Sequence, residues 1–233
     1  PHLFLWWFLK SGNKWGERAE GQFDSFCKTL DDYAKHKTLT LKIENIDMSF
    51  CEDFVNFMFD EKEYATNTVG SKIKNLNTFM GWADKSGLVP NNHYKFFKKP
   101  SAPTNIIALT TSEFQRFFNH EFKDPKLERA RDLFIFGAST GLRYSDLNNL
   151  TQISFVEGDI VGVTKKTKDR FEIPVNHFAE VILKKYDFQL PKISSQKLNQ
   201  YLKLAAKEAK LNREIEIVQF RGQKRISQIS ELS

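Results

Sequence analysis

The sequence predicts an α+β protein, mainly α-helical with a small antiparallel β-sheet, in two domains joined by a linker. Three observations support this. Apolar residues recur at helical spacing through the first hundred residues, a proline-containing stretch at 98–104 interrupts them, and the apolar period becomes strand-like over 153–175. We therefore expect a helical domain over 1–99, a linker over 100–107 and a second domain over 108–233.

The helices of the first domain are predicted from apolar stripes with spacings of three and four residues. Asp47 or Ser49 is expected to cap the second stripe, and Thr66 or Asn67 the third, which Gly87 ends. The stripes are Phe23, Phe26, Leu30 and Tyr33, then Phe50, Phe54, Phe57 and Met58, then Val69, Ile73, Leu76, Met80 and Ala83.

The second domain is expected to begin with a helix whose capping box pairs Thr110 with Glu113. A largely apolar helix over Arg129–Ser139 and a further turn from Asp146 follow. Three short strands and a final helix come next, and the charged turn 165–170 separates the last two strands. The strands are predicted at Ile153–Val156, Ile160–Thr164 and Phe171–Val175, and the helix at Lys197–Ala209.

Composition limits the function classes. The chain has 35 Lys and Arg against 29 Asp and Glu, an excess that favours a polyanionic partner, either nucleic acid or an anionic membrane surface. The apolar run Leu3–Leu9 is too short to span a bilayer, which takes about 20 residues. It is expected to be a buried helix or strand of a cytoplasmic protein. Cys27 and Cys51 suggest buried thiols, with a single disulfide as the alternative, and no metal-ligand spacing occurs.

Two stretches carry candidate chemistry. In Ser139–Leu147 one helix ends at Gly141 and another begins near Ser145, so Arg143 lies at a helix junction where its guanidinium can be held rigidly. The alternative is a simple ion pair between Arg143 and Asp146. The second stretch, Val163–Pro174, predicts a hairpin with a lysine-rich tip. This tip is either a solvated turn or one that projects a lysine into a DNA groove or an active site.

In this order and spacing the two stretches resemble the tyrosine recombinases of the phage integrase family, with the closest likeness to integrases of mobile elements in Bacteroides-like bacteria. That family has a Thr-Gly-x-Arg-x-x-Glu/Asp-Leu motif, and Thr140-Gly141-Leu142-Arg143-Tyr144-Ser145-Asp146-Leu147 matches it. A hairpin with a catalytic lysine follows in the family. Counting back from Ile173-Pro174-Val175 places Lys166 on that lysine, with Lys165 as the nearest competitor and Lys168 after it.

The resemblance implies a SAM-like helical core-binding domain followed by the N-terminal part of a catalytic domain. It implies Arg143 and Lys166 as catalytic residues, with Asp146 orienting Arg143. The first domain supports it, because the stretch 66–79 resembles the last long helix of the family's core-binding domain. The residues expected to face DNA on that helix, off its apolar stripe, are Thr68, Ser71, Lys72, Lys74 and Asn75, and those at the hairpin tip are Lys165 and Lys168.

Family features that follow the hairpin are not matched. No histidine starts a His-x-x-Arg box, and the tyrosines after the hairpin, Tyr186 and Tyr201, lie in segments that resemble ordinary helix or its flank. We expect a chain truncated before the nucleophile, which binds double-stranded DNA without cleaving it. The complete enzyme is expected to be a bacterial recombinase that assembles as a homo-tetramer on DNA without metal, small-molecule cofactor or membrane. The alternatives are a non-catalytic DNA-binding protein, such as a degenerate integrase or accessory factor, and a helical interaction module.

Overall fold

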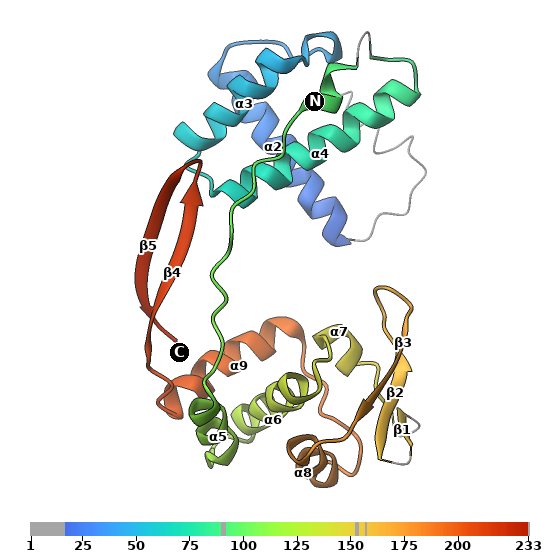
Figure 1. Ribbon diagram of the computed structural model, residues 1–233, viewed down its shortest axis with the longest axis vertical. Helices are drawn as coiled ribbons and strands as arrows, with labels where there is room; N and C mark the ends of the chain where they lie inside the picture. The colour runs from blue at the N-terminus through green and yellow to red at the C-terminus, as the bar shows by residue number, and fades with distance from the viewer. Residues whose placement is uncertain (1–16, 90–91, 152–153, 157, 233) are drawn as a thin grey trace. The chain divides into compact units, whose positions relative to one another are not determined.

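The computed structural model describes residues 17–89, 92–151, 154–156 and 158–232 (Figure 1). The chain forms two compact units. The first comprises Pro1–Asn105 together with Ile217–Gln228, and the second comprises Ile106–Glu216 with Ile229–Ser233. The division near residue 105 falls inside the stretch expected to be a linker. The apolar run Leu3–Leu9 lies outside the described residues.

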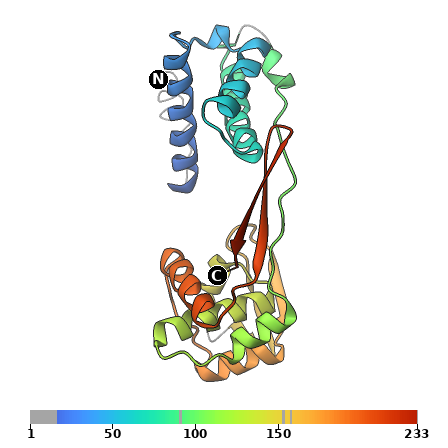
Figure 2. The same cartoon turned by 90° about the vertical axis from the view of Figure 1, so that its left-hand side faces the viewer.

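The first unit is helical, as predicted. Its helices α2 (Glu17–His36), α3 (Met48–Asp60) and α4 (Thr66–Lys85) pack around one core (Figures 1 and 2). The short 3₁₀ turns η1 (Ile43–Asn45) and η2 (His93–Phe96) complete it. Tyr33 stands at the centre of the core, and its ring meets three phenylalanine rings edge to face at 5.2 to 5.4 Å between centroids: Phe50, Phe54 and Phe57.

Caps fix where these helices start. Asp47 caps α3 as predicted, because its Oδ1 accepts a hydrogen bond from the Phe50 N–H at 2.8 Å. The prediction of a side-chain cap on α4 is wrong, since Ala65 precedes the helix and no side chain accepts from its first turn. Thr66 and Asn67 instead lie inside the helix, where their side chains bind other segments of the unit.

The segment after η2 lies directly on α4. Asn67 and Ala102 exchange two hydrogen bonds of 3.0 Å: the Asn67 amide donates to the Ala102 carbonyl, and the Ala102 N–H donates to Asn67 Oδ1. A Cβ atom at Gly70 would come within 2.1 Å of the Pro100 carbonyl oxygen. Only glycine allows this approach. Residues up to Ala102 are therefore attached to the first unit.

The second unit is α+β. Helix α6 (Pro125–Thr140) occupies its centre, packed by α5 (Thr111–Asn119), α8 (His177–Lys185) and α9 (Ser195–Glu208) (Figure 1). The capping box of α5 forms as predicted, with Thr110 and Glu113 bonded reciprocally. A buried salt bridge supports α6, in which Arg131 Nε lies 2.6 Å from Asp132 Oδ1.

The three short strands pair in the order β1-β2-β3, antiparallel throughout. They are β1 (Phe155–Val156), β2 (Asp159–Val163) and β3 (Arg170–Pro174). The predicted start of the first strand, Ile153, lies outside the described residues. Ile160 is fully buried and pairs with Ile173, which sets the face of the sheet that packs on the core.

A second hairpin, β4 (Glu214–Arg221) and β5 (Lys224–Glu231), was not predicted. Gly222 forms its turn with a left-handed φ of +58°. The far half of this hairpin belongs to the first unit, whereas the sequence assigned it to the second domain. The reason is specific bonding: the Thr66 hydroxyl donates to the Phe220 carbonyl at 2.8 Å, and Arg221 Nη1 lies 2.8 Å from Glu63 Oε1.

Candidate functional site

Arg143 lies between two helices of the second unit, as predicted. Gly141 ends α6 with a left-handed φ of +71°, and its N–H donates to the Gly137 carbonyl. Arg143 then takes an extended conformation as the N-cap residue of the short helix α7 (Tyr144–Leu147). Its side chain is exposed and has no hydrogen-bond or ion-pair partner within the part of the chain that the structure describes. The guanidinium is thus available to an external anion.

Asp146 has a different contact from the one predicted. Its carboxylate is buried, and Oδ1 accepts a hydrogen bond from the backbone N–H of Lys165 at 2.8 Å. No ion pair with Arg143 is found among the described residues. The Asp146 carboxylate therefore connects the arginine motif to Lys165, the first residue of the lysine-rich tip. A buried carboxylate needs a hydrogen-bond donor, and the Lys165 N–H supplies it. Arg143 does not, because its extended backbone leaves the guanidinium in solvent.

The tip itself is an ordered turn. The Thr164 N–H donates to the Asp169 carbonyl at 2.9 Å, and the Thr164 hydroxyl lies 2.7 Å from that of Thr167. Lys165, Lys166 and Lys168 are all exposed on this turn. The structure thus brings the Arg143 motif and the three candidate lysines to one edge of the second unit, while it does not select among the lysines.

Lys72 on α4 corrects the predicted DNA-facing set. The prediction that it lies off the apolar stripe is wrong, because Lys72 stands three residues after Val69 and four before Leu76 and so shares their face. Only 7% of it is exposed, and its ammonium donates to the carbonyl and the hydroxyl of Ser25 on α2 at 2.6 and 2.7 Å. Burial lowers the pKa of Lys72. We interpret it as a packing residue.

The other members of that set lie off the core. Thr68, Ser71 and Lys74 are exposed, and Asn75 is half-buried. Two of these side chains have partners in the first unit: the Ser71 hydroxyl donates to the Asn67 carbonyl at 2.9 Å, and Asn75 Nδ2 donates to the Gln22 carbonyl of α2 at 3.4 Å. Near its start, the exposed face of α4 therefore offers the cation Lys74 with the short hydroxyl side chains of Thr68 and Ser71.

The two tyrosines that follow the hairpin have structural surroundings. The Tyr186 hydroxyl donates to the buried carboxylate of Asp132 at 2.8 Å, and burial raises the pKa of Tyr186. Lys185 donates to the same carboxylate oxygen at 2.7 Å. Tyr201 is half-buried on α9. These contacts hold the Tyr186 hydroxyl inside the second unit, and its raised pKa favours the neutral phenol.

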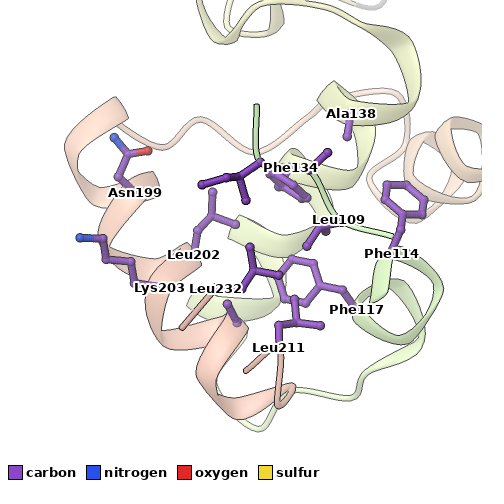
Figure 3. Close-up of a pocket in the computed structure, with 13 residues that line it drawn as sticks. Leu109, Phe114, Phe117, Phe134, Ala138, Asn199, Leu202, Lys203, Leu211 and Leu232 are labelled. Atoms are coloured by element: carbon purple, nitrogen blue, oxygen red, sulfur yellow. The ribbon is translucent and has the colours of Figure 1, made fainter. Parts of the chain in front are cut away.

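An apolar pocket of about 710 Å³ opens between α5, α6 and α9 (Figure 3). Phe117, Phe134 and Leu202 form much of its wall, Leu232 reaches into it, and Asn199 and Lys203 are its polar members. It lacks any acid–base pair, so it does not compete with the Arg143 edge as a reaction site.

Neither a metal site nor a membrane span emerges from the described part of the chain. There, no three His, Cys, Asp or Glu side chains gather closely enough to hold a metal ion. No described helix combines the length and apolar character needed to cross a bilayer. Cys27 and Cys51 are free thiols, and burial raises the pKa of each to about 11.

Several residues with specific contacts were missed by sequence reasoning. Asn67 and Gly70 hold the segment that ends at Ala102, and Arg221 pairs with Glu63. Gly70 gave a signal, since a glycine inside an amphipathic helix marks a close approach. Arg221 gave none, because its partner is 158 residues away in sequence.

Comparison with known proteins finds relatives for both parts of the chain. Residues 4–99 match the phage integrase SAM-like domain family. Tyrosine recombinase XerC of Roseiflexus sp. (strain RS-1) is 27% identical over 175 residues, which are 72% of this chain and 55% of that protein. A tyrosine recombinase of Thermosipho africanus (strain TCF52B) is 29% identical over 178 residues, 71% of this chain and 62% of that one.

The chain is thus similar over most of its length to tyrosine recombinases, and its first domain matches a phage integrase domain family. The chain spans somewhat more than half the length of these curated relatives. The fold agrees: a lambda integrase tetramer bound to a Holliday junction superimposes with a TM-score of 0.67 at 18% identity, over 95% of this chain and 67% of that one.

Proposed function

We propose that this protein is a site-specific DNA recombinase, or integrase, in which Arg143 and Lys166 act on the scissile phosphodiester. One observation carries the proposal: the hydrogen bond from the Lys165 N–H to Asp146, which tethers the residue next to Lys166 to α7, the helix that follows Arg143. This shared anchor supports the action of the arginine and of a hairpin lysine on one phosphate.

The proposed roles follow from charge. When a tyrosine oxygen attacks the phosphorus, negative charge builds on the non-bridging oxygens, and a planar guanidinium can donate two hydrogen bonds to them. The bond to the 5′ oxygen breaks, and Lys166 gives that oxygen a proton as general acid. The product is a 3′-phosphotyrosyl intermediate and a free 5′ hydroxyl, whose later attack reverses the step and rejoins strands.

DNA binding is part of the same proposal. The exposed face of α4, with Lys74 and the hydroxyls of Thr68 and Ser71, supplies donors of the kind that contact phosphates and base edges. Lys165 and Lys168 add charge at the hairpin tip. The lambda integrase structure named above is a tetramer on a DNA junction, and we extend that assembly to this protein on its two DNA sites.

The proposal is tested in the full-length protein, by measuring its covalent attachment to DNA. Lys166→Ala should lower the attachment rate by roughly a hundredfold, the size typical of general acid catalysis. A substrate with sulfur in place of the bridging 5′ oxygen should restore the rate, because a thiolate leaves without a proton. Arg143→Ala should lose attachment on both substrates.

Lys165→Ala and Lys168→Ala are the matched controls on the same turn, and Arg116→Ala on the exposed side of α5 is the control for Arg143. Sulfur rescue of the Lys165 or Lys168 variant instead would move the general acid to that residue. If DNA binds but no variant or wild-type protein forms an adduct, the protein is the non-catalytic DNA-binding alternative.

A further inference from the structure

A cleft of about 300 Å³ in the second unit gathers four cations from three separate segments. Lys126 and Arg129 come from the first turns of α6, Lys192 from the connection before α9, and Lys197 from the first turn of α9. The rest of the lining is Ile193, Ser194 and Tyr201, so no carboxylate faces the cleft.

These four cations differ from several other cations of the chain. Lys62, Lys185 and Arg213 each pair with a carboxylate at 2.6 to 2.8 Å. By contrast, the four cleft residues have no ion pair within the part of the chain that the structure describes. Arg129 is also held in place, because its Nε donates to the Pro125 carbonyl at 3.1 Å. Uncompensated cations held together repel one another, and an anion in the cleft would remove that cost.

The ends of the helices add to this field. Helix α9 starts beside the cleft, and its N-cap Ser194 accepts from the Lys197 N–H. The backbone N–H groups of a first helical turn favour an anion. This helix start matters here only in combination with the four side-chain cations.

A hydrogen bond connects the wall of the cleft to the residue that follows Arg143. The hydroxyl of Tyr144, the residue after Arg143, donates to the Ile193 carbonyl in the cleft wall. Duplex DNA carries one negative charge per about 1.7 Å of its axis. A duplex whose scissile phosphate lies at Arg143 therefore offers further phosphates to neighbouring surface cations.

We infer that this cleft is a phosphate-binding site, distinct from the Arg143 position, that takes backbone phosphates of the bound duplex. The ligand chemistry is a phosphate group held by Lys126, Arg129, Lys192 and Lys197. That its source is DNA rests on the proposed function, and a free phosphate compound is the other source of the same chemistry.

The test compares two double variants of the full chain with equal net charge. Lys192→Gln with Lys197→Gln empties half of the cleft, and Lys203→Gln with Lys207→Gln removes two exposed lysines further along α9. The dissociation constant for a labelled duplex is measured by fluorescence anisotropy from 50 to 200 mM salt. Each lost phosphate contact should flatten the plot of log affinity against log salt by about 0.9.

The cleft variant should thus have a slope of log affinity against log salt that is shallower by about 1.8. Between 50 and 200 mM salt, its affinity should fall by a factor roughly ten times smaller than that of the wild type. The control variant should keep a slope close to that of the wild type. Equal slopes for all three proteins would overturn the DNA assignment. Thermal unfolding of both variants confirms that the substitutions leave the fold intact.

A second arm uses inorganic phosphate and follows the backbone amide NMR signals of Ser195–Lys197. Weak, non-saturating shifts are expected if the cleft is built for a DNA backbone. Saturable shifts that the cleft variant abolishes, with an unchanged DNA slope, would keep the phosphate chemistry but replace DNA by a free phosphate compound. If the wild-type chain binds no duplex, the proposed function fails, and this titration alone decides whether the cleft binds phosphate.

Discussion

At the scale of single residues, two side chains show what periodicity can and cannot decide. Lys72 is a cation whose spacing from Val69 and Leu76 places it on the buried face of its helix. Its ammonium donates hydrogen bonds to the carbonyl and hydroxyl of Ser25. Asp146 serves the hairpin rather than the arginine beside it. The residue types of Lys72 and Asp146 predicted that each would make a polar interaction. Their hydrogen-bond partners lie on other segments of the chain, which sequence spacing alone does not identify.

At Gly70, the addition of a single methyl group is expected to destabilise the first unit. Gly70→Ala places a Cβ 2.1 Å from the Pro100 oxygen, so the segment through Ala102 must leave α4. We expect a net destabilisation of about 1 to 2 kcal/mol, since overpacking outweighs the gain in helix propensity. Amide hydrogen exchange at Ala102, whose N–H is bonded to Asn67, should accelerate.

Gly21→Ala is the matched control, because a Cβ there meets nothing within 4 Å on an exposed position of α2. It should stabilise the first unit by about 0.5 to 1 kcal/mol. If Gly70→Ala also stabilised the protein and left exchange at Ala102 unchanged, the close approach of the segment to α4 would be wrong.

At the scale of elements, local signals carried most of the prediction. Asp47 at the start of α3 and the Thr110–Glu113 box of α5 are complete within four residues, so the sequence alone could specify them. The hairpin β4–β5 was missed because only its turn glycine is local. Its far half is fixed by Thr66 and Glu63, far away in sequence. The phosphate cleft was missed for the same reason, since its cations come from three segments.

Helix α5 should make the second unit sensitive to acid. Arg213 bonds the Glu113 carboxylate at 2.8 Å, and this contact, opposed by burial and helped by Thr110, lowers the pKa of Glu113 from 4.5 to about 2. A depressed carboxylate pKa stabilises the fold above the unfolded value. That stability is fully present above pH 4.5 and is lost as the pH falls towards 2.

Glu113→Gln should therefore lower the free energy of unfolding at pH 7 by about 1 to 2 kcal/mol, a value reduced because the partly exposed Arg213 is screened by solvent. It should also weaken the decline of this free energy between pH 4.5 and 2. Denaturant unfolding at a series of pH values measures both effects. Glu180→Gln, in the exposed pair with Lys184, is the control and should change neither appreciably. Parallel pH curves for wild type and Glu113→Gln would contradict the assignment.

At the scale of the whole molecule, the chain divides into units that are not continuous in sequence. The first unit draws Ile217–Gln228 from beyond the second, although every buried core residue that the structure describes in it comes from positions 23 to 97. From this core we expect the first unit to fold independently. From the added hairpin we expect the stability of this unit to depend modestly on residues 217–228.

A fragment of residues 1–105 should accordingly fold, with helical circular dichroism and a cooperative melt. It should be less stable than the same unit in the full chain by about 1 kcal/mol, the size of a lost hydrogen bond and an exposed ion pair. Thr66→Ala should destabilise the full chain by a similar amount and leave the fragment unchanged, since its acceptor at Phe220 is then absent. An unfolded fragment would show that the hairpin is essential to the first unit.

The bonding of the hairpin tip to Thr66 and Glu63 also orders events in time. A ribosome that has finished residue 105 must still add more than a hundred residues before Gln228 appears, which takes on the order of ten seconds at the usual rates of synthesis. Throughout that interval the helices of the first unit can assemble around their core while the surface that receives the tip stays uncovered. The nascent protein would then reach its final arrangement late, when one short ribbon of chain returns to a structure formed long before it.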